Sequence, residues 1–126
     1  MMTIDEVIRR IGVVGIIPVV RAASVDEATR AVDAICSGGI PVLEITMTVP
    51  NAVSVIREVS SQYRGKVLVG AGTVTTSEQA EACIQSGAEF LVSPGCSLPV
   101  LSLAQGRNVL AIPGALTPTE PGIDSE

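Results

Sequence analysis

Histidine is absent from these 126 residues, and aromatic side chains make up only 2% of them. The commonest metal ligand and the commonest general base of enzymes are therefore missing, so any chemistry must use carboxylates, hydroxyls, backbone groups or lysine. A core with so few aromatic rings must be built from valine, isoleucine, leucine and alanine. That composition suits buried parallel strands and the helices that cover them.

Charge and cysteine spacing exclude further classes of protein. The net charge is −5 and Lys66 is the one lysine, so we expect no binding to nucleic acid or to a membrane surface. Cys36, Cys83 and Cys96 lie far apart, without a disulfide framework or the spacing of a zinc site. The longest apolar stretch, residues 11–20, is much shorter than the roughly 20 residues of a spanning helix. With no signal-peptide pattern at the N-terminus, we expect a cytoplasmic protein.

Short β-branched runs alternate with helical periods along the chain. We predict strands at residues 13–20, 42–46, 66–69, 89–92 and 109–112. We predict helices at residues 3–11, from Ser24, from Pro50 or Asn51, from Ser77, and at residues 98–105. This alternation indicates a parallel α/β sheet covered by helices, either an open doubly wound sheet or part of a (β/α)8 barrel. A whole barrel needs about 200 residues or more, so the pattern alone leaves both open.

Three features of the predicted strand ends and turns are candidates for chemistry, and the one lysine is not. Glu44 lies in an apolar strand, where burial would raise its pKa and suit it to proton transfer, unless it faces water at an edge. Arg21 follows the first strand and suits a carboxylate or phosphate, although a lone arginine more often faces solvent. The glycines of residues 70–73 form either a backbone cradle for an anion or a tight turn. Lys66 is expected on the surface, away from Glu44.

Five segments carry a family resemblance, each at a predicted strand end. They are IPVVRA at 17–22, LEITMTVP at 43–50, VGAGTV at 69–74, GAEFLVSPG at 87–95 and IPGALTPTE at 112–120. In this order they resemble the 2-keto-3-deoxy-6-phosphogluconate aldolase family, which includes 4-hydroxy-2-oxoglutarate and 2-keto-3-deoxy-6-phosphogalactonate aldolases. The resemblance implies a (β/α)8 TIM barrel, usually a homotrimer, with residues 1–120 as its N-terminal part of about five βα units. Residues 121–126 do not match.

The resemblance also implies a reaction and its residues. A class I aldolase of this kind uses no metal or cofactor; its lysine forms a Schiff base, and a keto-deoxy sugar acid is cleaved to pyruvate and an aldehyde. Glu44 matches the general acid/base. The implied substrate-binding residues are Arg21, Thr48, Gly72, Thr73 and Pro94. One family branch has arginine where Thr48 stands; the chain resembles a second branch, with Thr-Val-Pro there and an arginine at the position of Arg21.

One family residue is missing from the sequence. The Schiff-base lysine belongs to a Lys-x-Phe-Pro motif on the sixth strand, and these 126 residues contain no such motif. We therefore expect the chain to be inactive alone. Two alternatives follow: an assembly module that pairs through bare strand edges with a second copy, a complementing chain or an intact aldolase, or a carboxylate binder that uses Arg21 and residues 70–73 without catalysis.

Overall fold

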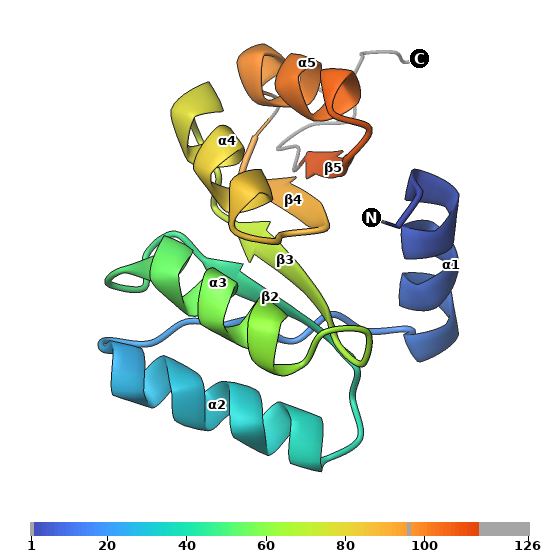
Figure 1. Cartoon of the computed structure of the whole chain (residues 1–126). Coiled ribbons are helices and arrows are strands. Elements are labelled where there is room, and N and C mark those ends of the chain that lie inside the picture. Colours follow the sequence, from blue (N-terminus) through green and yellow to red (C-terminus); the bar gives the residue numbers. More distant parts are fainter. Residues whose placement is uncertain (1, 96, 114–126) are drawn as a thin grey trace.

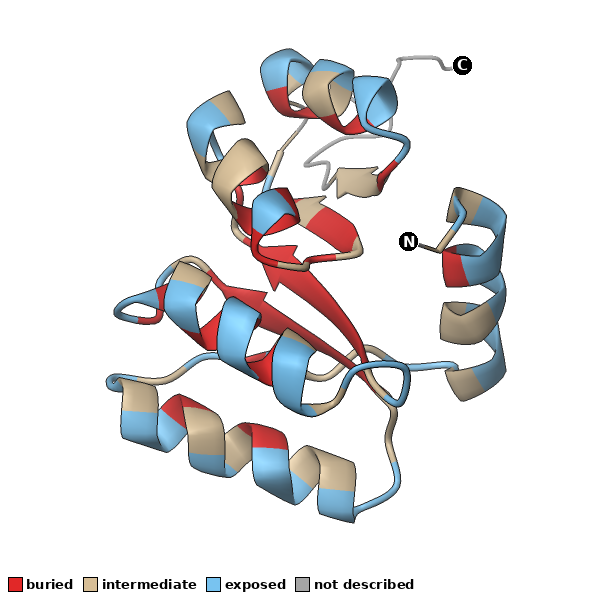
Figure 2. Cartoon of the chain, in the orientation of Figure 1, coloured by how far each residue is buried: buried red, intermediate tan, exposed pale blue. Residues whose placement is uncertain are grey.

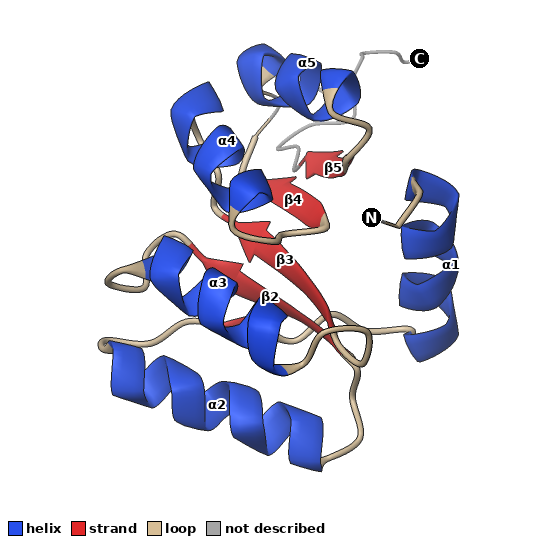
Figure 3. Cartoon of the chain, viewed as in Figure 1, coloured by secondary structure: helices blue, strands red, loops and turns tan. Residues whose placement is uncertain are grey.

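A computed structural model of the chain describes residues 2–95 and 97–113, and strands alternate with helices along it (Figures 1 and 3). The helices are α1 (Ile4–Val14), α2 (Val25–Ser37), α3 (Ala52–Gln62), α4 (Ser77–Gln85) and α5 (Leu98–Gly106). The strands are β1 (Val19–Val20), β2 (Val42–Thr46), β3 (Leu68–Gly72), β4 (Phe90–Ser93) and β5 (Leu110–Pro113). The predicted alternation is confirmed.

The five strands form one parallel sheet in the order β1-β2-β3-β4-β5. A doubly wound sheet reverses its strand order part-way and carries crossover helices on both faces. Here each strand pairs with the next along the chain, and α2 to α5 cover the same side of the sheet (Figure 1). Of the two predicted architectures, the barrel arrangement is therefore the one observed.

Each face of the sheet has its own apolar cluster. The outer cluster joins α2 to α5 to strand residues that include Leu43, Ile45 and Leu91. The inner cluster joins Phe90 and the first residues of β2 and β3 to Val7 of α1. In Figure 2 the helices are buried only along the side that meets the sheet. Helix α1 thus covers the inner face near the amino ends of the strands and leaves their carboxyl ends open.

Alternation along β2 decides where its polar residues point. Successive side chains of a strand point to opposite faces, so Glu44 and Thr46 share the inner face with Val42. Val42 belongs to the inner cluster together with Phe90, whereas Leu43 and Ile45 belong to the outer cluster under the helices. Glu44 therefore stands on the inner face, beyond the region that α1 covers and close to the carboxyl end of β2.

Two predicted strands were misplaced. The first is only Val19–Val20, because residues 13 and 14 extend α1, in which Val14 packs on the inner cluster before Gly15 ends the helix with φ 85°. The third is Leu68–Gly72 rather than residues 66–69, because Gly70 and Gly72 pair with Glu44 and Thr46 of β2. Packing against neighbours outweighed intrinsic preference in both places.

The start of α2 agrees with its sequence signal only in part. Ser24 caps the helix, and its Oγ accepts a hydrogen bond from the Glu27 N–H at 3.1 Å. The Glu27 side chain, however, accepts from the N–H of Ala23 at 2.9 Å rather than from that of Ser24, so only one of the two hydrogen bonds of a capping box is formed.

Several predictions fall outside the described residues. These are Cys96, the end of the fifth motif at 114–120, the boundary at residue 120 and the tail 121–126. Within residues 2–95 and 97–113, no helix is long and apolar enough to cross a membrane.

Candidate functional site

Glu44 is the buried carboxylate of the inner sheet face. Its residue is 7% exposed, and its backbone N–H donates to the Pro18 carbonyl at 2.9 Å. Desolvation raises the pKa of the Glu44 carboxyl, and the positive charge of Arg21 lowers it by a smaller amount. The sequence prediction of a raised pKa is confirmed. A carboxyl with a raised pKa is better suited than an ordinary glutamate to take up and return a proton.

Glycine at position 72 gives the Glu44 side chain its space. A Cβ at Gly72 would overlap Oε2 of Glu44 and lie 2.5 Å from its Cδ and 2.9 Å from its Cγ. Carbon atoms in contact normally stay about 3.5–4.0 Å apart. The carboxylate of Glu44 therefore lies directly on the backbone of β3, in a place that no other residue type leaves open.

Gly70 has a similar role one step earlier in β3. A Cβ there would overlap the Phe90 ring and lie 2.5 Å from its Cδ2. The ring, which is fully buried, thus lies across Gly70 on the inner face. Both glycines are strand residues paired with β2, so the prediction that they lie in a loop or turn after the third strand is wrong for them. Close packing against Phe90 and Glu44 explains why these two positions are glycine.

Thr73 begins the turn that leaves β3. Its φ of 56° is left-handed, a conformation that few residues other than glycine adopt. The next residue, Val74, donates its N–H to the Val92 carbonyl of β4 at 3.1 Å, which fastens the turn to the sheet. Strained backbone of this kind concentrates at functional sites, because the surrounding fold must maintain it. Thr73 thus stays a candidate substrate-binding residue, next to Gly72 in the chain.

A pair of threonines lies at the end of β2. Thr46 is fully buried, Thr48 is exposed, and their hydroxyl oxygens are 2.6 Å apart. The N–H of Met47 donates to the Gly72 carbonyl at 2.8 Å, which holds this turn against β3. Thr46 was not predicted as a site residue. The sequence did hold a signal for it: Thr46 is two residues after Glu44, and residues two apart in a strand share a face.

Arg21 directly follows the carboxyl end of β1, and Pro94 directly follows the carboxyl end of β4. Val19 pairs with Glu44, so the residue two further on, Arg21, continues on the same face beyond β1, where it is exposed. Pro94 is exposed directly after β4, in a turn where the Ser93 hydroxyl donates to the Gly95 carbonyl at 2.8 Å. Pro94 also lines a hollow of about 190 Å³. The predicted residues therefore gather at one end of the sheet.

The described residues offer no amine at this end. Lys66 is exposed and precedes β3, so it lies at the amino ends of the strands, as predicted. Within the described ranges, no group of three or more histidine, cysteine, aspartate or glutamate side chains could hold a metal ion. The arrangement thus offers a buried carboxyl, a guanidinium group and two threonine hydroxyls.

Comparison with known proteins shows which family the chain belongs to. A sequence model of the family described as KDPG and KHG aldolase matches residues 4–124. The chain belongs to this family. The resemblance inferred from the five motifs is thereby confirmed, and KDPG and KHG stand for the phosphogluconate and hydroxy-oxoglutarate substrates named above.

Individual aldolases agree with that assignment. The chain is 39% identical to the 2-dehydro-3-deoxy-phosphogluconate aldolase of Treponema pallidum over 95% of the chain and 55% of the relative. It is 33% identical to the KHG/KDPG aldolase of Escherichia coli strain K12, over 83% of the chain and 49% of the relative. The chain thus spans about half the length of these relatives.

Solved structures give the same fold. A KDPG aldolase from Legionella pneumophila, captured with pyruvate as a covalent carbinolamine, superposes with a TM-score of 0.73 at 33% identity. The match covers 80% of the chain and 48% of that structure. The fold is therefore that of the (β/α)8 aldolases, and the five-stranded sheet is about half of such a barrel.

Proposed function

We propose that this chain supplies the proton-transfer and keto-acid-binding part of a class I aldolase site. The reaction is cleavage of a 2-keto-3-deoxy-6-phospho sugar acid or of 4-hydroxy-2-oxoglutarate to pyruvate and an aldehyde. The observation that carries the proposal is the buried Glu44 carboxyl, with its raised pKa, lying on Gly72 at the carboxyl ends of the strands. Barrel enzymes carry their chemistry at that end.

The reaction needs a group that first takes up a proton and later returns one, and we assign both transfers to Glu44. Cleavage removes a proton from the substrate hydroxyl, breaks the neighbouring carbon–carbon bond and moves the electron pair to a Schiff-base nitrogen, which releases the aldehyde. Return of a proton to the remaining carbon and hydrolysis then give pyruvate. A single carboxyl with a raised pKa can accept the first proton and deliver the second, directly or through one water molecule.

The nitrogen itself is not provided by these residues. The family's Schiff-base lysine is not among the 126 residues, and Lys66 is at the opposite ends of the strands from Glu44. Catalysis therefore needs a lysine from further protein sequence or from another chain. Reduction with borohydride in the presence of pyruvate is expected to leave this chain unmodified, and a pyruvyl adduct on Lys66 would contradict the assignment.

Substrate binding is assigned to groups around Glu44. Arg21 is placed to bind the carboxylate of the keto acid, because a guanidinium pairs well with a planar carboxylate. Thr48, Gly72 and Thr73 border the reacting end, and Pro94 lines the wall across β4. These roles rest on the family resemblance together with the shared position of the residues at one end of the sheet.

Titration with pyruvate tests the binding half of the proposal. Saturable binding in the millimolar range, with amide shifts at Gly72 and Thr73, is expected from nuclear magnetic resonance. Arg21→Gln should weaken binding by about tenfold, since charge-assisted hydrogen bonds are worth about 1.5–3 kcal/mol. Arg30→Gln, an equal charge change on the exposed face of α2, should leave it unaltered. No shift up to tens of millimolar pyruvate would refute the binding role.

A second candidate function is assembly with another chain. Within the described residues β1 and β5 each pair on one side only. Val13 near the end of α1, Ile16 before β1 and Val19 in β1 are 78%, 56% and 49% exposed. Bare edges and exposed apolar side chains of this kind favour pairing. A designed cube-shaped cage built from fused symmetric oligomeric domains superposes with a TM-score of 0.76 at 33% identity, over 82% of this chain and 38% of that one.

We infer that the partner is a second copy or a chain that completes the barrel. Sedimentation velocity at micromolar concentration should show a species larger than the monomer, and a single monomeric boundary would contradict this function. The family's trimer and a cytoplasmic location stay predictions.

A further inference from the structure

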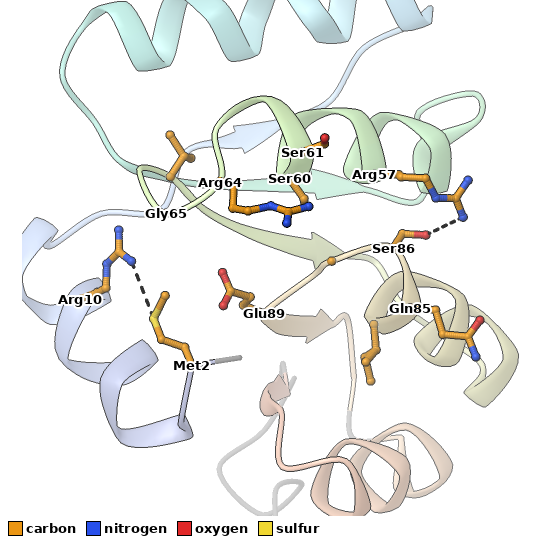
Figure 4. A pocket seen from close by; sticks show the side chains of 13 residues that line it. Met2, Arg10, Arg57, Ser60, Ser61, Arg64, Gly65, Gln85, Ser86 and Glu89 are labelled. Carbon is orange, nitrogen blue, oxygen red and sulfur yellow. Dashed lines mark hydrogen bonds between the residues drawn. The ribbon is translucent and has the colours of Figure 1, made fainter.

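A hollow of about 650 Å³ lies near the amino ends of β3 and β4, away from the carboxyl ends where the candidate site lies (Figure 4). Its walls come from α1, from the turn between α3 and β3, and from the turn between α4 and β4. Pockets that hold small molecules commonly have volumes of about 300–1,000 Å³. The hollow is therefore large enough for a ligand, and none of the residues given a catalytic or substrate-binding role lines it.

Positive charge dominates this hollow. Arg10, Arg57 and Arg64 line it from separate elements, and Glu89 is the one carboxylate in its lining (Figure 4). The formal balance is +2, in a chain whose net charge is −5. A concave wall lined by one sign of charge concentrates ions of the opposite sign. The lining of the hollow is therefore positive although the chain as a whole is negative, and the hollow favours binding of an anion.

None of the three guanidinium groups forms an ion pair with a carboxylate of the described residues. Across the part of the chain that the structure describes, the one ion pair joins Arg107 to Glu81. Arg57 donates to the Ser86 hydroxyl at 3.2 Å, and Arg10 donates to the Met2 sulfur at 3.7 Å, so both keep further N–H groups free to donate.

A serine in the wall also lacks a partner. The Oγ of Ser60 is buried and makes no hydrogen bond with any described residue. It is confined by Gly87, where a Cβ would lie 2.7 Å from that oxygen. In Figure 4 Ser60 stands beside Arg64. Ser60 lines the hollow, so its hydroxyl is a candidate donor to an anion bound there.

We propose that the hollow formed by Arg10, Arg57, Arg64 and Ser60 binds a phosphate group, either free phosphate or the phosphate of a small ester. The tetrahedral dianion matches the chemistry of the wall, because guanidinium groups bind phosphate oxygens in pairs and a hydroxyl can serve a further oxygen. The C-terminal ends of α3 and α4 line the same hollow, and the partial negative charge of helix C-termini would attract arginines even without a ligand. If the helix ends alone explain the arginines, the hollow should not bind phosphate, so a binding measurement distinguishes the two explanations.

Calorimetric titration of the full chain with inorganic phosphate, at constant ionic strength set by sodium chloride, tests the site. Saturable binding of one phosphate per chain is expected. Arg64→Gln and Arg57→Gln should each weaken it by about tenfold or more, as expected for loss of a charge-assisted hydrogen bond. Arg30→Gln changes the charge equally but lies outside the hollow, and it should change the dissociation constant less than twofold.

A parallel titration with glycerol 3-phosphate distinguishes the two sources. Equal affinity assigns the site to the phosphate group alone, and tighter binding of the ester assigns it to phosphorylated metabolites. Absence of saturable binding for both probes, or equal weakening by all three arginine variants, would overturn the proposal. Glu44→Gln should leave phosphate affinity unchanged, so this result is read independently of the pyruvate titration.

Discussion

Replacement of Gly72 by alanine tests the geometry that places the Glu44 carboxylate. The added Cβ would overlap Oε2 of Glu44 and lie 2.5 Å from Cδ, about 1 Å inside the usual carbon–carbon contact distance. The backbone of β3 cannot retreat easily, because Gly72 pairs with Thr46 and its carbonyl accepts the Met47 N–H at 2.8 Å. The side chain of Glu44 must therefore move.

The expected cost is that of an overpacked site. Forcing extra carbon atoms into a packed core costs about 1–3 kcal/mol, and we expect the free energy of unfolding to fall by about that amount in Gly72→Ala. In a completed barrel the displaced carboxylate should also lower the rate by about a hundredfold, because misplacing a catalytic group by about 1 Å has effects of that size.

Denaturant unfolding, followed by circular dichroism, measures the stability change. Gly12→Ala is the matched control: a Cβ there meets nothing within 4 Å, and alanine inside a helix is favoured over glycine by about 0.5–1 kcal/mol. The same substitution type should therefore stabilise at one position and destabilise at the other.

A double-mutant cycle attributes the cost to Glu44 itself. In a Glu44→Ala background the Oε2, Cδ and Cγ atoms are gone, so Gly72→Ala should cost less than about 0.5 kcal/mol there, and the difference is the coupling energy. An equal loss of stability in both backgrounds would refute the reasoning, because the penalty would then come from the β3 backbone and not from the carboxylate.

Three further predictions concern other parts of the chain. Desolvation raises the pKa of Glu44 in the folded state, so its stabilising contribution is present below the unfolded glutamate pKa and is lost as pH rises through the folded value. Glu44→Gln should therefore gain stability over the parent as pH rises through that window in thermal melts, with the exposed Glu58→Gln as the charge-matched control. Phe90→Ala should lower the free energy of unfolding in urea by about 3–5 kcal/mol, since the ring is fully buried across Gly70, and Phe90→Leu should cost clearly less. Ser24→Ala removes the cap of α2 and should cost about 1 kcal/mol by the same assay, and no loss would show that the bond to Glu27 contributes nothing.

Regular periodicity made most of the fold predictable from the sequence. The strand at residues 42–46 and the helix from Ser77 were placed correctly because burial pattern and capping signal agree there. The first strand was misjudged because β-branched Val13 and Val14 suggest a strand, whereas α1 continues through them to pack Val14 against the inner cluster. Local propensity carries no information about a partner that lies far along the chain.

The candidate site was less predictable than the fold. Glu44 could be identified because a carboxylate in an apolar strand is costly unless it is used. Gly72 was selected through family resemblance, but its physical reason, contact with the Glu44 carboxylate, required coordinates. The link between the buried Thr46 and the exposed Thr48 was missed altogether, since a hydroxyl pair across a turn leaves no pattern in the sequence.

The central claim is that Glu44 moves the protons of an aldolase reaction at the carboxyl ends of these strands. The most direct test is a chimeric barrel that joins this chain to the remaining half of the Escherichia coli KHG/KDPG aldolase, assayed for release of pyruvate from 2-keto-3-deoxy-6-phosphogluconate. The parent chimera should cleave the substrate. Glu44→Gln should slow cleavage by about 10²–10⁴-fold while a pyruvate adduct still forms on borohydride reduction. A folded chimera in which Glu44→Gln cleaves as fast as the parent would contradict the account.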